Sequence, residues 1–154
     1  MNPARPAAVN LARDLCLRLI ERRTLAPEQL PGALGFLALA AENLMAAEAG
    51  GPESLYPARL ARDLTLKLIE RNLVGTVQAT AESLAENWRL VRRAAEGLPP
   101  AAAPAALGAA RDLALKFLET GRLGRTEWPE MFIRLARAAA GLPESEGGEK
   151  GAIS

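Results

Sequence analysis

The sequence of 154 residues contains no histidine and a single cysteine. The commonest general base and the commonest metal ligand are therefore missing, and a zinc site built from Cys and His is impossible within the chain. Cys16 has no partner for an internal disulfide. Aromatic residues make up 4% of the chain, and Val, Ile and Thr are sparse, so strand-forming residues are scarce. These absences argue against a metal site, a cofactor site and β structure.

Net charge and long apolar runs are also missing. The 19 basic and 18 acidic side chains nearly cancel, so no long-range field would steer the protein to nucleic acid or to an anionic membrane. No apolar run approaches the roughly 20 residues of a membrane-spanning helix. Residues 1–8 have no apolar run of signal-peptide length. We therefore expect a cytoplasmic protein without membrane contact, and the abundance of Ala, Arg, Leu, Gly and Pro suggests a bacterial one.

A pentapeptide recurs at intervals of 49 residues. It reads LARDL at 11–15 and at 60–64, and AARDL at 109–113. Apolar residues with helical spacing surround each copy, and Pro and Gly interrupt them. The pattern predicts an all-α fold of three tandem helical hairpins with six main helices, in a compact bundle or a short solenoid. We expect one repeat domain over residues 1–142, with repeats of about 9–51, 52–98 and 105–142, followed by a flexible tail at 143–154.

The helices of each repeat are amphipathic, and neither terminal repeat looks like a polar cap. Trp88 and Trp128 lie on the apolar stripes of second helices, so we expect both in the core. Thr76 is a candidate N-cap, and the three prolines of residues 97–104 favour an extended linker. The predicted apolar arcs of the three first helices are Leu11, Ala12, Leu15, Cys16, Leu19 and Ile20; Leu60, Ala61, Leu64, Thr65, Leu68 and Ile69; and Ala109, Ala110, Leu113, Ala114, Phe117 and Leu118.

Charged residues recur on the other face of each first helix. An acidic, a basic and an acidic residue follow one another at i, i+4 and i+7, a spacing that allows two favourable pairs per helix. We favour a solvated, salt-bridged face over a charged strip for docking a partner. The three sets are Asp14, Arg18 and Glu21; Asp63, Lys67 and Glu70; and Asp112, Lys116 and Glu119.

The arginine of the pentapeptide is a charged residue that lies inside the apolar arc. Arg13, Arg62 and Arg111 share this position in the three repeats. Such an arginine can lay its methylenes on the core and reach a carbonyl or carboxylate of a neighbouring hairpin, which is the role we favour. The alternative is a ring of three arginines that converges on an anionic ligand. These three residues are therefore the candidate interaction or ligand residues.

A short pattern opens the second helices of two repeats. Gln29-Leu30-Pro31 is followed by Leu34 and an Ala-rich run, and Glu127-Trp128-Pro129 echoes it, whereas repeat two lacks the proline. With the helix before it, this segment (residues 11–44) resembles the N-terminal helical segment of the Ros/MucR family of bacterial zinc-finger regulators. The resemblance implies helix-mediated self-association. The zinc finger of that family is not possible in this chain.

No phosphate-binding loop, nucleophile elbow or clustered pair of carboxylates is present in the sequence. We therefore expect no enzymatic activity and no catalytic, cofactor or metal residues. The leading hypothesis is a helical repeat module for protein–protein interaction or self-association. The alternative is a small regulatory protein that binds an anionic ligand or nucleic acid through the repeated arginines.

Overall fold

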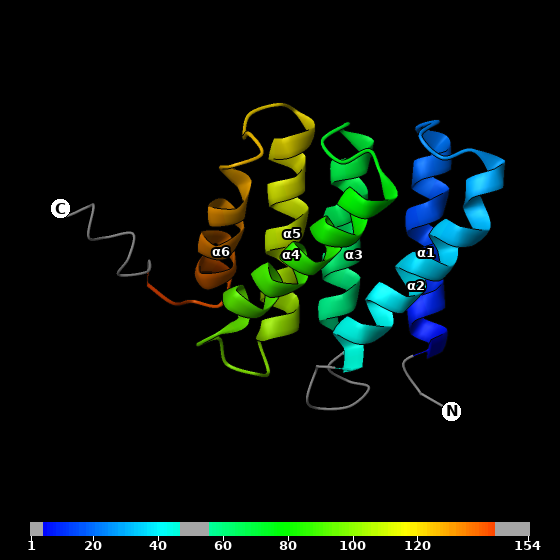
Figure 1. Ribbon diagram of the computed structural model, residues 1–154. Helices are drawn as coiled ribbons and strands as arrows, with labels where there is room; N and C mark the ends of the chain where they lie inside the picture. The colour runs from blue at the N-terminus through cyan, green and yellow to red at the C-terminus, as the bar shows by residue number, and fades with distance from the viewer. Residues whose placement is uncertain (1–4, 47–55, 144–154) are drawn as a thin grey trace. The chain divides into compact units, whose positions relative to one another are not determined.

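The computed structural model describes residues 5–46 and 56–143, and this part of the chain folds into six α-helices arranged as hairpins (Figure 1). The all-α fold with hairpins is thereby confirmed. Of the predicted tail at 143–154, all but Pro143 lies outside the described residues. The helices are α1 (Arg5–Glu21), α2 (Leu30–Ala46), α3 (Tyr56–Glu70), α4 (Val77–Ala95), α5 (Ala103–Glu119) and α6 (Trp128–Ala139), with a 3₁₀ turn η1 (Pro27–Gln29) before α2.

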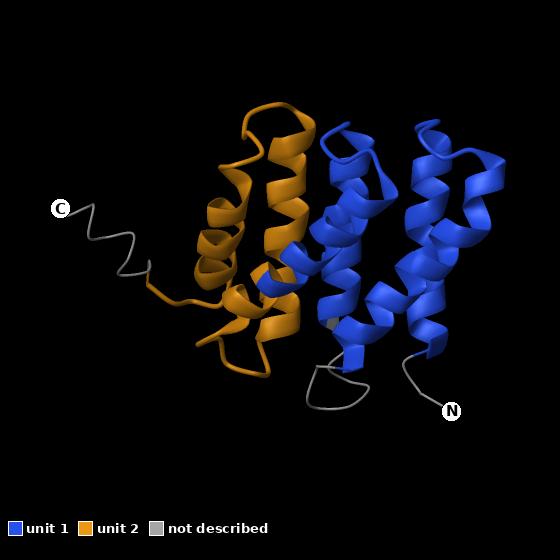
Figure 2. Cartoon of the chain, in the orientation of Figure 1, with its two compact units in different colours: residues 1–89 blue, residues 90–154 orange. Residues whose placement is uncertain are grey.

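The chain divides into two compact units, residues 1–89 and residues 90–154 (Figure 2). Unit 1 contains the α1–α2 hairpin and α3, which packs against α1. Unit 2 contains the α5–α6 hairpin. The single repeat domain over residues 1–142 stays a prediction.

The first helix of every repeat ends in the same way. Its last turn is closed by a residue with positive φ: Arg23 at 63°, Asn72 at 64° and Gly121 at 77°. These residues lie one repeat apart, and each ends its helix in a Schellman motif. In each motif the next residue's N–H bonds to a carbonyl five residues earlier: Thr24 to Leu19 (3.0 Å), Leu73 to Leu68 (2.9 Å) and Arg122 to Phe117 (2.9 Å).

Two expectations about helix starts have different outcomes. Thr76 caps α4 as predicted, because its Oγ accepts the backbone N–H of Ala79 at 3.0 Å. The prediction of an extended linker over residues 97–104 is wrong. The carbonyl of Pro99 accepts the N–H of Ala103 at 3.0 Å, so this segment turns directly into α5. Pro104 stands in the first turn of that helix, where its missing N–H costs little.

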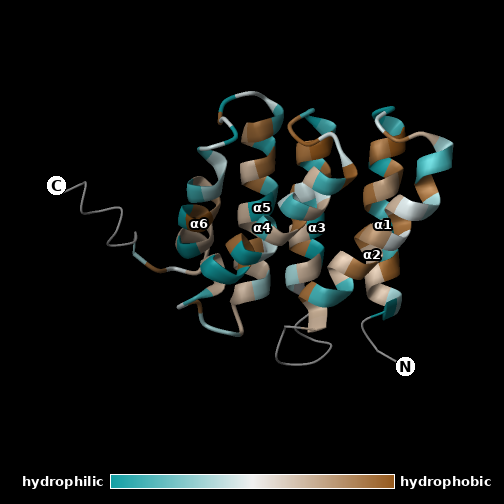
Figure 3. Cartoon of the chain, in the orientation of Figure 1, coloured by the Kyte–Doolittle hydropathy of each residue, from teal (hydrophilic) through white to brown (hydrophobic). Residues whose placement is uncertain are grey.

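Hydrophobic and hydrophilic residues alternate along each helix (Figure 3), and the apolar arcs are buried most completely in α3. All six predicted positions of that arc are buried, as are Trp88 and Trp128. In α1 and α5, the buried side is narrower than the predicted apolar arc. Ile20 of α1 is 41% exposed, and Leu113 and Phe117 of α5 are 54% and 38% exposed. An apolar arc is buried only over the width that its neighbours cover.

A buried polar pair joins α3 to α4 in unit 1. The side-chain amide of Asn87 donates to the hydroxyl of Thr65 at 2.8 Å, and that hydroxyl donates to the carbonyl of Ala61 at 2.8 Å. Both side chains are almost fully buried. The other two repeats have Cys16 and Ala114 at the position of Thr65, and both are also buried, so this position holds a small side chain in every repeat.

The glycine at the end of α5 provides a test of the shared helix ending. Gly121→Ala should lower the free energy of unfolding by about 1 kcal/mol, because a Cβ disfavours the left-handed conformation. Its Cβ would meet nothing within 4 Å, so backbone strain is the only expected cost.

Gly35→Ala is the matched control for this change. Gly35 lies inside α2, and its Cβ would also meet nothing within 4 Å. This change should raise the free energy of unfolding by about 0.5–1 kcal/mol. Chemical denaturation measures both values, and equal effects of the two substitutions would contradict the assignment.

Candidate functional site

The repeated arginines form the same local ion pair in all three repeats. Each Nε donates to a carboxylate oxygen of the following aspartate, at 3.0 Å for Arg13, 3.0 Å for Arg62 and 2.9 Å for Arg111. Their exposures differ, because the Arg13 side chain is 58% exposed and those of Arg62 and Arg111 are 29% and 25% exposed. The arginine position is therefore covered to different extents in different repeats.

Arg62 also makes a contact between repeats. Its Nη1 lies 3.2 Å from Oδ2 of Asp14, which joins α3 to α1. This is the kind of contact that the position of the arginine in the apolar arc suggested. Arg111 lies in unit 2, and the ring of three arginines stays a prediction.

The charged face of α1 is linked to α3 at one further point, and the turns that follow the two helices are also linked. Arg18 lies 3.5 Å from Glu70, and Arg22 donates to the side-chain oxygen of Asn72 at 2.9 Å. Glu70 also accepts a hydrogen bond from Lys67 at 2.7 Å, and this bond, more than the neighbouring positive charges, lowers the pKa of the Glu70 carboxyl. The charged face is thus partly an interface within the chain rather than a solvated surface alone.

The expected pairing along the helices needs one correction. The i+4 and i+7 members of each set pair as expected: Arg18 with Glu21 (3.1 Å), Lys67 with Glu70 (2.7 Å) and Lys116 with Glu119 (3.1 Å). Asp14, however, pairs with the arginines of the pentapeptides rather than with the basic residue one turn later. A neighbouring guanidinium and one from α3 both reach this carboxylate.

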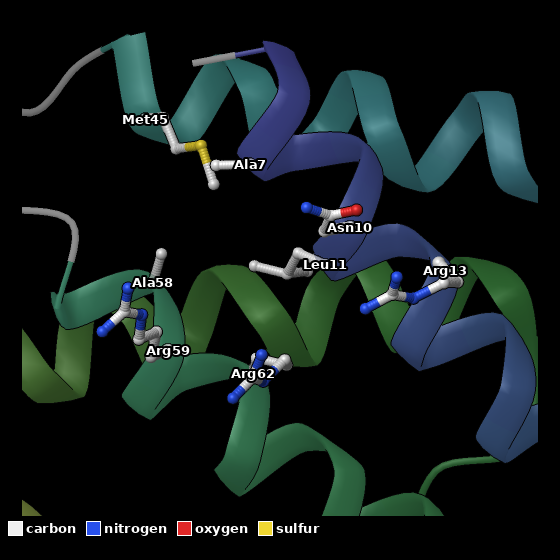
Figure 4. A pocket seen from close by; sticks show the side chains of 8 residues that line it. All are labelled: Ala7, Asn10, Leu11, Arg13, Met45, Ala58, Arg59 and Arg62. Carbon is white, nitrogen blue, oxygen red and sulfur yellow. The ribbon is translucent and has the colours of Figure 1, made fainter. Parts of the chain in front are cut away.

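A small pocket lies where α1 meets α3 near the end of α2 (Figure 4). It has a volume of about 250 Å³ and is lined by Arg13 of α1, by Arg59 and Arg62 of α3, and by apolar side chains that include Met45. Three guanidinium groups in one pocket form a site that can attract an anion. Two of the three already bind carboxylates, which reduces the positive potential there.

Sequence reasoning found two of these three arginines. Arg59 has no counterpart in the other repeats, where Asn10 and Gly108 stand at its position, so the repeat pattern gave no reason to select it. Met45 and Arg59 come together only through the packing of the first hairpin on α3. Arg59 could have been selected because it lies three residues before Arg62, which puts both arginines on one side of α3.

The surroundings of the thiol and the spacing of possible metal ligands can be described directly. Cys16 is buried, and burial raises the pKa of its thiol, so the nucleophilic thiolate is disfavoured. Within residues 5–46 and 56–143, no three His, Cys, Asp or Glu side chains lie close enough to hold a metal ion. Over the same ranges, no helix has the length and apolar character needed to cross a membrane.

No family model matches the chain, and neither a curated protein nor a solved structure is detectably similar to it. The resemblance of residues 11–44 to the Ros/MucR segment therefore stays a prediction. The residues that carry it have a local role here. The side chain of Gln29 accepts the backbone N–H of Ala26 at 2.8 Å, and Glu127 accepts that of Gly124 at 2.7 Å. Both bonds satisfy N–H groups where a second helix begins.

A double-mutant cycle tests the contact between Arg62 and Asp14. Asp14→Asn, Arg62→Gln and the double variant should give a coupling of about 0.5–1 kcal/mol in the free energy of unfolding at low salt, because both side chains are partly buried. The coupling should shrink in about 1 M salt.

Arg13→Gln is the control for this cycle, since its side chain is more exposed and bonds to Asp14 on the same helix. It should change the free energy of unfolding by less than about 0.5 kcal/mol. A coupling of zero at low salt would show that the contact between repeats does not stabilise unit 1.

Proposed function

We propose that the protein is a non-enzymatic helical repeat module that binds other protein surfaces, including other copies of itself. The observation that carries this proposal is a set of large apolar side chains on the surfaces of both units. Among the residues that the structure describes, seven such side chains are 38–55% exposed: Val9, Leu17 and Ile20 on α1, Phe36 and Leu39 on α2, and Leu113 and Phe117 on α5.

The physical argument is the cost of leaving these groups in water. Fully burying one such side chain is worth about 1.5–3 kcal/mol, and half-burial correspondingly less. Single exposed apolar residues need no explanation, whereas several on one hairpin favour a protein contact. Five of the seven lie on the α1–α2 hairpin. The nearly balanced charge of the chain supports a protein partner over nucleic acid.

The test compares the wild type with the double variant Leu17→Ser/Ile20→Ser. Sedimentation velocity over a range of concentrations measures self-association, and affinity purification from the source cells identifies other partners. The variant should lose self-association or a specific partner, because two apolar contacts on α1 are removed.

The matched control is Gln78→Ser/Glu82→Ser, which changes two exposed polar residues of α4. It should behave like the wild type. A monomeric wild-type protein whose partners are the same as those of the Leu17→Ser/Ile20→Ser variant would overturn the proposal.

The pocket supports a second candidate function, which is binding of a small anion by Arg13, Arg59 and Arg62. Calorimetric titration with inorganic pyrophosphate tests it directly. Arg59→Gln should weaken binding about tenfold, because one charge-assisted hydrogen bond to the anion is lost.

Arg71→Gln, an exposed residue that does not line the pocket, is the control for this titration and should leave the affinity unchanged. No binding at millimolar pyrophosphate, or equal losses in the two variants, would reject this function.

A further inference from the structure

The packing of α3 on α1 shows how one repeat covers the next. On α3, the side that faces α1 is largely buried, with Ala58 at 4% and Ile69 at 1% exposed and with Arg62 paired to Asp14. The same side of α1 is open. The positions on α3 are Ala58, Arg62, Leu66 and Ile69, and their counterparts on α1 are Val9 (40% exposed), Arg13 (58%, side chain), Leu17 (50%) and Ile20 (41%).

The side of α1 that takes part in this interface has an equivalent side on α5, and that side of α5 is exposed. The apolar positions that α1 turns to its neighbours are buried, with Leu15 fully and Leu19 almost fully enclosed. Their equivalents on α5, Leu113 and Phe117, are 54% and 38% exposed. The chain therefore exposes both halves of an interface that it forms once inside unit 1: the α1 face, defined by Val9, Arg13, Leu17 and Ile20, and the α5 face, defined by Asp112, Leu113, Lys116 and Phe117.

The charges of the two faces are complementary in the same register. In the pair Arg62–Asp14, Arg62 corresponds to Arg13 on the α1 face and Asp14 corresponds to Asp112 on the α5 face. The side chains of Arg13 and Asp112 are 58% and 69% exposed. In the pair Arg18–Glu70, Arg18 corresponds to Lys116 on the α5 face and Glu70 corresponds to Glu21 on α1. The side chains of Lys116 and Glu21 are 69% and 67% exposed. Each half of the two pairs already holds a partner on its own helix, as the corresponding residues in unit 1 do.

We propose that the chain associates head to tail with a second copy of itself. The α1 face of one copy packs on the α5 face of the next, as α3 packs on α1 within the chain. This inference rests on the proposed function, for which it names the partner and the surface. Because the two faces differ, the contact does not close on itself in a dimer and can continue from copy to copy.

A twofold dimer through either face would not form the pairs that join α3 to α1. It would place each face against its own copy, so neither the pair of Arg13 with Asp112 nor that of Lys116 with Glu21 could form. Repeat proteins that remain monomeric carry polar outer faces on their terminal repeats. In this chain the first and the last repeat carry exposed apolar residues on the α1 face and the α5 face instead.

Charge reversal tests the register. Arg13→Asp and Asp112→Arg should each lower the self-association constant about tenfold or more, measured by sedimentation equilibrium, because an attractive pair becomes repulsive. An equimolar mixture of the two variants should recover the association of the wild type, since each junction in the mixture then joins opposite charges.

Arg71→Asp is the control, because it reverses an exposed charge in the turn after α3 that belongs to neither face, and it should associate like the wild type. Circular dichroism and Tm confirm that each variant folds, as expected for exposed positions. In the wild type, the mean mass should rise with concentration beyond that of a dimer.

The outcomes separate this inference from the proposed function. A wild type that stays monomeric at all concentrations overturns head-to-tail association, while the proposed function is then judged by the partners that the Leu17→Ser/Ile20→Ser variant loses. A wild type that associates but stops at a dimer, or whose variants do not recover in the mixture, overturns the head-to-tail register alone.

Discussion

The α1–α2 and α5–α6 hairpins carry more apolar surface than their own helices bury against each other. Helix α1 shows the consequence, because its side toward α2 and α3 is buried while Leu17 and Ile20 on the far side stay in water. Helix α3 has the same sequence pattern, and there the matching position Ile69 is 1% exposed. Coverage by a neighbouring repeat, rather than the pattern of a single helix, therefore decides what is core.

The repeated arginine has two roles that this constraint explains. In every repeat it pairs with the aspartate that follows it, which neutralises both groups at the edge of an apolar face. Where a preceding repeat is packed alongside in unit 1, as for Arg62, the same guanidinium reaches the aspartate of that repeat. A partly buried ion pair adds little stability, but an unpaired charge there would cost more, so the pair favours one register of packing over others.

The sequence predicted the helices, hairpins and turns because these depend on local periodicity and on breakers. It also placed Trp88 and Trp128 in the core, as helical spacing required. It did not predict that Leu113 would be exposed, because a helical wheel gives the width of an apolar arc but not the number of neighbours that cover it. The bond between Asn87 and Thr65 and the position of Arg59 in the pocket were missed for a related reason, since both depend on how one helix lies against another.

The proposed function rests on surfaces, because large apolar side chains of α1, α2 and α5 are exposed. The central claim is that the two open faces fit one another in the register of α3 on α1. Cross-linking tests this most directly, with Glu21→Cys in one batch and Lys116→Cys in another, both in a Cys16→Ala background. A short bismaleimide should join the two batches when mixed much faster than it joins either batch to itself. Equal or faster cross-linking within a single batch would contradict the account.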